Sequence, residues 1–172
     1  MLIVNYFKKI KLKDKNHYFS GLSFNDQTCK KNHIFFAIKG NEKNGNKFID
    51  SAIKKGATTI VSNKKFQGLK KKILYIKSLN VRKTLSEISF SICKFKPNNL
   101  IAVTGTNGKS SIADFYFQIL MLNKKKVASI GTLGVHTVTR KKIASNTTLD
   151  PIQLSNYLKR LKEQKIDNVI LE

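Results

Sequence analysis

The residues with the clearest potential for chemistry lie close together at positions 104–111. Besides Thr104, they are two glycines, a lysine and several hydroxyl or amide side chains: Gly105, Thr106, Asn107, Gly108, Lys109, Ser110 and Ser111. Glycines let a backbone turn tightly so that its N–H groups point inward and can bind phosphate oxygens. The ammonium of Lys109 can reach a terminal phosphate, and Ser110 is placed to bind a Mg²⁺ that bridges the phosphates. This segment predicts a site for nucleotide phosphates.

The sequence on either side has the order that a phosphate loop needs. Residues 100–103 are apolar and predict a short buried strand. After the loop, Ile112, Phe115, Ile119 and Leu120 recur at helical spacing, and the amino end of that helix would add partial positive charge. The pattern G-x-x-x-x-G-K-[ST] is incomplete, because Val103 stands at its first glycine. The alternative interpretation is a strand-to-helix turn that happens to contain a lysine.

Further strands and a helix follow this loop. Residues 127–130 predict a strand that runs into a glycine turn at 131–134, and residues 169–171 predict another that ends in the carboxylate of Glu172. Asp150 and Pro151 have the residue types that begin a helix. Alternating strands and helices imply a parallel sheet, with ligands at the carboxyl ends of its strands. An acid at the position of Glu172 often holds Mg²⁺ in nucleotide-binding folds.

Asn146, Thr147 and Thr148 lie just before this helix. The hydroxyls of the two threonines would be near its positive end, where they could meet an anionic ligand. The alternative is that the segment only caps the helix.

The first half of the chain predicts a separate α/β domain. Strands are expected at 34–38, 58–62 and 73–76, with a solvated lysine-rich connection between the last two. A short helix should end at Gly56, and a longer one, capped by Asn80, should carry Val81, Leu85, Ile88 and Ile92. Residues 1–22 give only a weak helical pattern. Residues 94–99 interrupt the periodicity, so we expect domains at 1–96 and 97–172.

Composition narrows the class of protein. The formal net charge is +23, but it comes almost wholly from lysines spread along the chain, without an aromatic-interleaved basic segment or a recognition helix. We therefore expect no specific nucleic-acid partner, although a basic nucleic-acid binder is an alternative that a salt titration would separate. Cys29 and Cys93 match no metal spacing and suggest reduced thiols. The apolar runs are too short for a signal sequence or membrane span, which predicts a cytoplasmic protein.

Several segments together resemble the Mur ligases of peptidoglycan synthesis. They are residues 104–111, the Gly-Thr-Leu-Gly turn at 131–134, Asn-Thr-Thr at 146–148 and Val-Ile-Leu-Glu at 169–172. Upstream, residues 35–40, 44–45 and 48–57 are similar to the branch that adds the third amino acid, meso-diaminopimelate or L-lysine, to a UDP-N-acetylmuramoyl dipeptide. The resemblance runs from about residue 21 to 172. The nucleotide motif alone would also fit folylpolyglutamate synthases.

The resemblance implies an ATP-dependent, amide-forming ligase. Its fold would be a small mixed α/β domain that binds the UDP substrate, followed by the first half of a parallel-sheet P-loop ATPase domain. ATP would phosphorylate a substrate carboxylate, and an incoming amine would displace the phosphate. Residues 105–111 would hold the ATP phosphates. Lys109 would neutralise charge on the transferred phosphate, and Ser110 with Glu172 would bind Mg²⁺.

The resemblance also implies where the UDP-sugar substrate binds. Phe24 and Asp26 fall where the family contacts the uridine, Asn41, Glu42 and Lys43 fall in a second uridine-side loop, and Asn146, Thr147 and Thr148 match a segment that contacts the sugar substrate. Residues 25–27 read Asn-Asp-Gln where the family usually has Asp-Ser-Arg. An acidic Asp26 close to a diphosphate is electrostatically unfavourable.

The chain stops at Glu172, before the serine and histidine that usually follow this acid in the family. We expect an N-terminal piece without the amino-acid domain, unable by itself to form the amide, with an exposed sheet edge and a partly uncovered core. We also expect a monomer without membrane contact. A non-catalytic module that only holds the nucleotide or the UDP-sugar is the alternative from another functional class.

Overall fold

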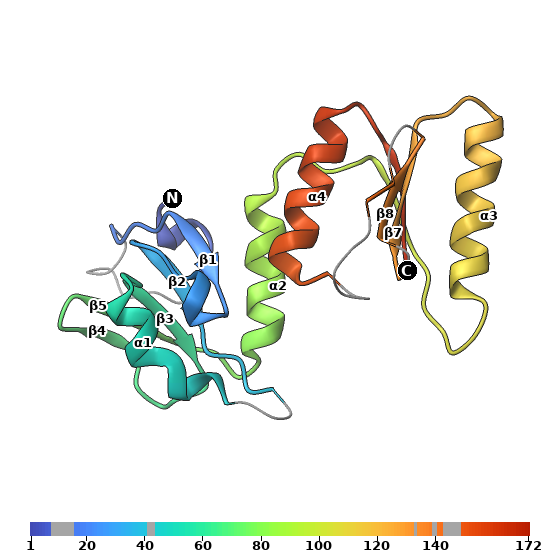
Figure 1. Cartoon of the computed structure of the whole chain (residues 1–172). Helices are drawn as coiled ribbons and strands as arrows, with labels where there is room; N and C mark the ends of the chain where they lie inside the picture. Colours follow the sequence, from blue (N-terminus) through green and yellow to red (C-terminus); the bar gives the residue numbers. More distant parts are fainter. Residues whose placement is uncertain (8–15, 41–43, 133, 139–140, 143–148) are drawn as a thin grey trace. The chain divides into compact units, whose positions relative to one another are not determined.

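The computed structural model describes residues 1–7, 16–40, 44–132, 134–138, 141–142 and 149–172 (Figure 1). These residues form two compact units, Met1–Ser91 and Ile92–Glu172. The domain boundary expected after residue 96 lies within the second unit. Both units combine helices with mainly parallel sheets, and the predicted α/β fold class is confirmed.

The sheet of the first unit has the strand order β1-β2-β3-β5-β4. Its parallel strands are β1 (Gly21–Ser23), β2 (His33–Phe36), β3 (Thr59–Ser62) and β5 (Ile73–Lys77). The helices are α1 (Ile49–Lys54), which follows the 3-10 helix η4 (Gly45–Phe48), and α2 (Val81–Ile92). Aromatic and β-branched residues favour a pleated, buried strand, and the central strands β2 and β3 form the core through Ile34, Phe35, Phe36, Ile60 and Val61.

Three parts of this unit differ from the sequence-based expectation. Strand β1 lies in a segment where no strand was predicted. The lysine-rich connection between β3 and β5 contains a short strand, β4 (Gly68–Lys70), which pairs antiparallel with β5. The amino terminus is also part of the fold, since the Met1 ammonium donates to the Phe19 carbonyl at 2.7 Å. Ile3, in the 3-10 helix η1 (Ile3–Asn5), and Phe19 are both buried. These contacts join residues far apart in the sequence, so local periodicity gave no signal for them.

The sheet of the second unit has the order β6-β10-β7-β8-β9. Strands β6 (Asn99–Ala102), β10 (Asn168–Leu171) and β7 (Val127–Gly131) are parallel, as predicted, with β10 in the middle. Strands β8 (Gly134–Thr137) and β9 (Lys141–Lys142) add an antiparallel extension that the sequence did not predict. Figure 1 shows this sheet between helices α3 (Lys109–Leu122) and α4 (Pro151–Glu163).

The prediction that residues 100–103 form a buried strand is wrong about burial. Every residue of β6 is exposed, with Leu100 at 38% and Ile101 at 40%. Among the strands that the structure describes, β6 lies at the edge of the sheet and pairs with β10 alone. Helix α3 buries Ala113, while Ile112, Phe115 and Ile119 are exposed. The expected exposed sheet edge and uncovered apolar surface are thus present in this unit.

The predicted helix boundaries rest on capping contacts. Asp150 accepts hydrogen bonds from the Ile152 and Gln153 amides, both at 2.9 Å, and Pro151 is the first helical residue of α4. Asn80 caps α2 by accepting from the Lys83 amide at 2.9 Å. Gly56 follows α1 with φ +102°, a left-handed conformation that favours glycine. Within the described ranges, we find no helix with the length and apolar character needed to cross a bilayer.

Candidate functional site

The phosphate-loop segment connects the carboxyl end of β6 to the amino end of α3. Two of its residues need glycine, because Gly105 has φ +150° and Gly108 has φ +77°. An added Cβ at Gly108 would meet no atom within 4 Å, so the backbone conformation, not crowding, requires glycine there. Gly108 immediately precedes the helix and its carbonyl accepts from the Ile112 amide. The sequence therefore builds a tight turn directly onto a helix amino terminus, where anions are favoured.

Lys109 lies across this loop. Its ammonium donates to the carbonyl of Gly105 at 2.6 Å and to that of Thr106 at 3.2 Å. The other predicted phosphate-binding residues, Thr106, Asn107, Ser110 and Ser111, are solvent exposed. A cation is thus held above an accessible loop, close to the helix end that would face a phosphate.

A second group of predicted residues meets beside this loop. Ser110 donates its hydroxyl to one carboxylate oxygen of Glu172 at 2.6 Å, and the Thr132 hydroxyl donates to the same oxygen at 2.8 Å. The Thr132 backbone amide donates to the other oxygen at 3.2 Å. We call Ser110, Thr132 and Glu172 the carboxylate cluster. It unites the start of α3 with the residues that follow β7 and β10.

Thr132 is absent from the residues singled out from the sequence. The glycine turn that contains it was recognised as a ligand-binding position, and that turn was the available signal. What could not be read locally is that β10 inserts between β6 and β7, which brings Glu172 to the Thr132 amide.

The surroundings of Glu172 stabilise its charged form. The hydrogen bond from Ser110 is the main cause that lowers the pKa of Glu172, and it outweighs partial burial, which acts in the opposite direction. Hydrogen bonds from Thr132 and the charge of Lys109 lower the pKa further. The carboxylate of Glu172 is therefore ionised at neutral pH.

Gly131 makes room for this carboxylate. A Cβ at Gly131 would lie 2.6 Å from Oε2 of Glu172 and 2.7 Å from its Cβ, closer than real Cβ atoms approach. Any side chain there would push Glu172 away. The close contact accounts for glycine at the end of β7, where the backbone itself has no left-handed conformation.

The carboxylate cluster contains the kind of oxygen ligands that Mg²⁺ prefers. It offers one carboxylate and two hydroxyl oxygens, all hard ligands, and no sulfur or imidazole is among them. Across the described part of the chain, no group of three or more His, Cys, Asp or Glu residues could form an all-protein metal cage. One carboxylate with a hydroxyl suits a Mg²⁺ that takes its other ligands from phosphates and water.

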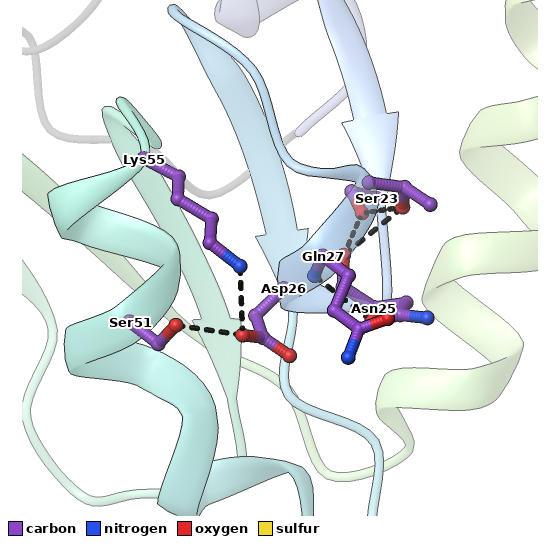
Figure 2. Close-up of polar contacts among 7 residues, drawn as sticks. Ser23, Asn25, Asp26, Gln27, Ser51 and Lys55 are labelled. Atoms are coloured by element: carbon purple, nitrogen blue, oxygen red, sulfur yellow. Dashed lines mark hydrogen bonds and ion pairs between the residues drawn. The ribbon is translucent and has the colours of Figure 1, made fainter.

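In the first unit, Asp26 makes a compact set of polar contacts (Figure 2). Its carboxylate accepts from the Ser51 hydroxyl at 2.6 Å and pairs with the Lys55 ammonium at 3.2 Å. The hydrogen bond from Ser51 is the main cause that lowers the pKa of Asp26; desolvation opposes it, and Lys55 lowers the pKa further. The negative charge expected to oppose a diphosphate is thus compensated by Lys55, a residue that sequence reasoning did not connect with Asp26.

Phe24 comes directly after β1 and two residues before Asp26, and its side chain is 39% exposed. The backbone around it is held by Ser23, whose hydroxyl donates to the Asn25 carbonyl at 2.5 Å and contacts the Thr28 hydroxyl at 2.8 Å. Asn25 in turn caps the 3-10 helix η3 (Asp26–Thr28) by accepting from the Gln27 amide (Figure 2). Phe24 is therefore presented at the carboxyl edge of the parallel sheet, the edge at which α/β folds bind ligands.

Six of the residues singled out from the sequence lie outside the described ranges. They are Asn41, Glu42, Lys43, Asn146, Thr147 and Thr148. Their proposed contacts with the UDP-sugar substrate stay predictions.

Comparison with known proteins bears on both units. Residues 103–172 match the family model of the Mur ligase middle domain. The chain is 38% identical over 162 residues to the UDP-N-acetylmuramoyl-L-alanyl-D-glutamate–2,6-diaminopimelate ligase of Rickettsia prowazekii, a match that covers 92% of the chain and 33% of that protein. It is 36% identical over 156 residues to the ligase of the same name from Clostridium tetani, covering 88% of the chain and 32% of that protein. The chain thus spans about a third of the length of these relatives.

Solved structures show the same fold. A structure of a UDP-N-acetylmuramoyl-L-alanyl-D-glutamate–2,6-diaminopimelate ligase matches with a TM-score of 0.80 and 23% identity, over 100% of the chain and 36% of that protein. The MurF ligase of Thermotoga maritima in complex with ADP matches with a TM-score of 0.55 and 18% identity, over 87% of the chain and 30% of that protein. With the sequence relatives and the family model, these matches show that residues 103–172 correspond to the Mur ligase middle domain and that the chain is similar to about a third of a UDP-N-acetylmuramoyl-L-alanyl-D-glutamate–2,6-diaminopimelate ligase.

Proposed function

We propose that this chain supplies the nucleotide-binding and UDP-substrate-binding parts of an ATP-dependent ligase that adds an amino acid to a UDP-N-acetylmuramoyl dipeptide. The observation that carries the proposal is the carboxylate cluster beside the phosphate loop. There, at the amino end of α3, the Ser110 hydroxyl oxygen lies 2.6 Å from a carboxylate oxygen of Glu172. The names of the sequence relatives support the reaction and the substrate class.

In this proposal the ATP phosphates bind residues 105–111. Lys109 would exchange its contacts with the Gly105 and Thr106 carbonyls for phosphate oxygens, and loop amides would add hydrogen bonds. Ser110 and Glu172 would hold Mg²⁺, and Thr132 would keep Glu172 oriented. The ion, when bound, would neutralise charge on the phosphates.

The proposed reaction has two group transfers. The dipeptide carboxylate attacks the terminal phosphorus of ATP, so that an acyl phosphate forms and ADP leaves. The amine of the incoming amino acid then attacks the acyl carbon, the amide forms, and phosphate leaves with the bonding electrons. Positioning and neutralisation of phosphate charge are the contributions that the phosphate loop and the carboxylate cluster would make.

The first unit is proposed to bind the uridine end of the substrate through Phe24 and the segment around Asp26, together with residues 41–43. Pairing of Asp26 with Lys55 supports this role, because a compensated carboxylate repels a diphosphate less than a free one. Residues 146–148 of the second unit are proposed to contact the sugar. The buried free thiols of Cys29 and Cys93 support a reducing compartment, and we propose the cytoplasm.

The test is Mg²⁺-dependent ATP binding, measured by titration calorimetry on the chain and on Lys109→Ala. Removing a cation that pairs with phosphate should weaken binding by about 2–4 kcal/mol. Lys94→Ala is the matched control, since it removes an exposed lysine before β6 and should leave affinity nearly unchanged. If Lys109→Ala bound ATP as tightly as the parent chain, the phosphate-loop assignment would be wrong.

A parallel assay tests the substrate class and separates catalysis from binding. The chain is incubated with ATP, the UDP-N-acetylmuramoyl dipeptide and diaminopimelate, and ADP and the tripeptide product are quantified. Dipeptide binding without product would favour the binding module, whereas coupled ADP and tripeptide release would show catalysis. Saturable binding of a folate in place of the dipeptide would instead favour a folylpolyglutamate-synthase-like ligase.

A further inference from the structure

A cavity in the second unit is not used by the proposed nucleotide site. Its volume is about 480 Å³, within the range typical of small-molecule sites. It is lined by Met121, Lys124, Lys125, Lys126, Val127, Thr137, Val138, Gln164 and Ile166. Val127 begins β7 whereas Thr132 follows its end, so the cavity and the carboxylate cluster are separated along the sheet by about 13 Å of strand. An occupant of the cavity would leave the phosphate loop accessible.

The lining combines an apolar surface with a cationic margin. Met121, Val127, Val138 and Ile166 provide the apolar part, and three consecutive exposed lysines, Lys124 to Lys126, provide the charge. Among the described residues that line the cavity, none carries a carboxylate. An uncharged ligand would leave the three ammonium groups without a partner from the lining.

The neighbouring acids do not offset this charge. Glu163 lies 3.8 Å from Lys159, and Asp167 lies 2.5 Å from Lys162, so each has a cation of its own. The carboxyl ends of α3 and α4 also face this region and would contribute partial negative charge. Their terminal carbonyls are occupied, however, because Leu120 accepts from the Lys125 amide and Leu161 accepts from the Ile166 amide. Three full positive charges therefore outweigh two partly satisfied helix ends.

We propose that this cavity binds a small amphipathic anion, a carboxylate or phosphate monoester that carries a short alkyl chain. The acidic head lies among Lys124, Lys125 and Lys126, and the alkyl chain lies on the Met121, Val138 and Ile166 surface. Charge complementarity selects the head, and burial of apolar surface selects the chain. The site is independent of the proposed ligase activity.

Calorimetric titration of the full chain tests this with four probes: octanoate, octyl phosphate, octylammonium and inorganic phosphate, each below the concentration at which micelles form. Saturable binding of octanoate or octyl phosphate is expected at one equivalent, and the tighter of the two identifies the head group. Octylammonium and inorganic phosphate should each bind at least about tenfold more weakly, because each lacks one of the two complementary parts.

Two matched triple variants separate the site from general positive charge. K124Q/K125Q/K126Q removes the cationic margin and should lower affinity about tenfold. K70Q/K71Q/K72Q removes three equally exposed lysines from the first unit and should change affinity by less than about twofold. Both runs contain left-handed lysines, Lys124 in one and Lys71 and Lys72 in the other, so their backbone demands are similar.

A third variant tests the apolar part without disturbing the core. Val138 is 54% exposed, so Val138→Asn should fold, as circular dichroism would verify, and should weaken octanoate more than inorganic phosphate. The proposal is overturned if no alkyl anion saturates, if octylammonium binds as tightly as octanoate, or if both triple variants lose affinity equally. Equal loss would show only general electrostatic attraction to a chain of net charge +23.

Discussion

The carboxylate of Glu172 accepts hydrogen bonds from Ser110 and Thr132, which lie 62 and 40 positions earlier in the chain. Each partner is an ordinary hydroxyl residue on its own, and only their convergence holds one ionised carboxylate beside Lys109. In the first unit, Asp26 is likewise defined by Ser51 and Lys55. At both places a side chain predicted from the sequence acquires its electrostatic character from partners supplied by the fold.

Gly131→Ala should disturb the carboxylate cluster without removing any of its polar groups. The new Cβ would lie 2.6 Å from Oε2 of Glu172, so the carboxylate must move and its contacts with Thr132 should break. Hydrogen bonds to a charged group contribute about 1.5–3 kcal/mol, and we expect Mg²⁺-dependent ATP binding to weaken by an amount in that range. Titrating ATP at several Mg²⁺ concentrations measures this. Gly68→Ala in the first unit is a control for glycine replacement as such: its φ of +131° makes the substitution costly to stability, but its Cβ would meet no atom within 4 Å and the Mg²⁺ dependence should stay parental. A parental Mg²⁺ dependence in Gly131→Ala would contradict the prediction.

Asp26 should make the stability of the first unit depend on acid pH. Its pKa is lower in the folded chain than in the unfolded chain, chiefly through Ser51, so the unfolded state binds more protons as the pH falls. The stabilisation is complete above the unfolded pKa, about 3.9, and disappears as the pH falls through the lower folded value. Urea denaturation of the parent and Asp26→Asn should therefore show a difference at about pH 6 that shrinks towards about pH 3.

NMR titration of the Asp26 carboxyl gives the control. Ser51→Ala and Lys55→Ala should each raise the pKa of Asp26, because the hydrogen bond from Ser51 and both the hydrogen bond and the charge of Lys55 lower it. An unchanged pKa in either variant would contradict the contacts described for Asp26.

At the scale of elements, periodicity predicts which residues share a face but not what covers that face. Ile112, Phe115 and Ile119 have the spacing of a core stripe, yet all three are exposed on α3, and β6 is an exposed edge. In α4 the same kind of pattern does mark the core, because Leu158 and Leu161 are buried. The two helices therefore differ in how much of their apolar face is packed against the rest of the unit.

Two alanine substitutions, one in each helix, should therefore differ in how much they lower the free energy of unfolding. Leu158 is fully buried, so Leu158→Ala should lower the free energy of unfolding by about 2–5 kcal/mol. Phe115 is 62% exposed, so Phe115→Ala should change it by only about 0.5 kcal/mol. Urea denaturation of both variants checks the contrast. Equal losses would mean that Phe115 packs against something in solution.

For the whole molecule, the dominant feature is its charge. The net charge of +23 makes the folded chain repel itself, and the ion pairs found among the described residues are mostly exposed and individually weak. The lysines are distributed over both units, so the repulsion is general. This distribution agrees with the expectations of a monomer and of no specific nucleic-acid partner, which stay predictions.

Raising NaCl from low concentration to about 0.15 M should raise the melting temperature, because salt screens repulsion more than it weakens the few attractive pairs. Differential scanning calorimetry at fixed pH measures the change. Lys162→Gln serves as a control that removes one partner of a close ion pair with Asp167 and should keep the same salt trend. A melting temperature that fell with salt would show that attractive pairs dominate instead.

Most local structure was predictable from residue types. Asp150 with Pro151, Asn80 and Gly56 marked helix ends correctly, because capping depends on a few neighbouring atoms. The central parallel strands were also found, since β-branched runs and alternation with helices are local signals. Strands β1, β4, β8 and β9 and the packing of the amino terminus were missed. Strands β4, β8 and β9 belong to local antiparallel hairpins, but they are only two to four residues long, too short to leave a clear strand pattern. The amino terminus packs through contacts such as that of Met1 with Phe19, which no local pattern marks.

The sequence by itself determined the resemblance to Mur ligases, the α/β class and the residue types of the phosphate loop, because two glycines, a lysine and a serine between a strand and a helix specify a backbone shape. Only the tertiary structure decided that Thr132 holds Glu172, that Lys55 compensates Asp26, and that β6 and one side of α3 are exposed. The physical reason is that charge compensation and burial depend on which segments become neighbours. Insertion of β10 between β6 and β7 creates such neighbours without leaving a local pattern in the sequence.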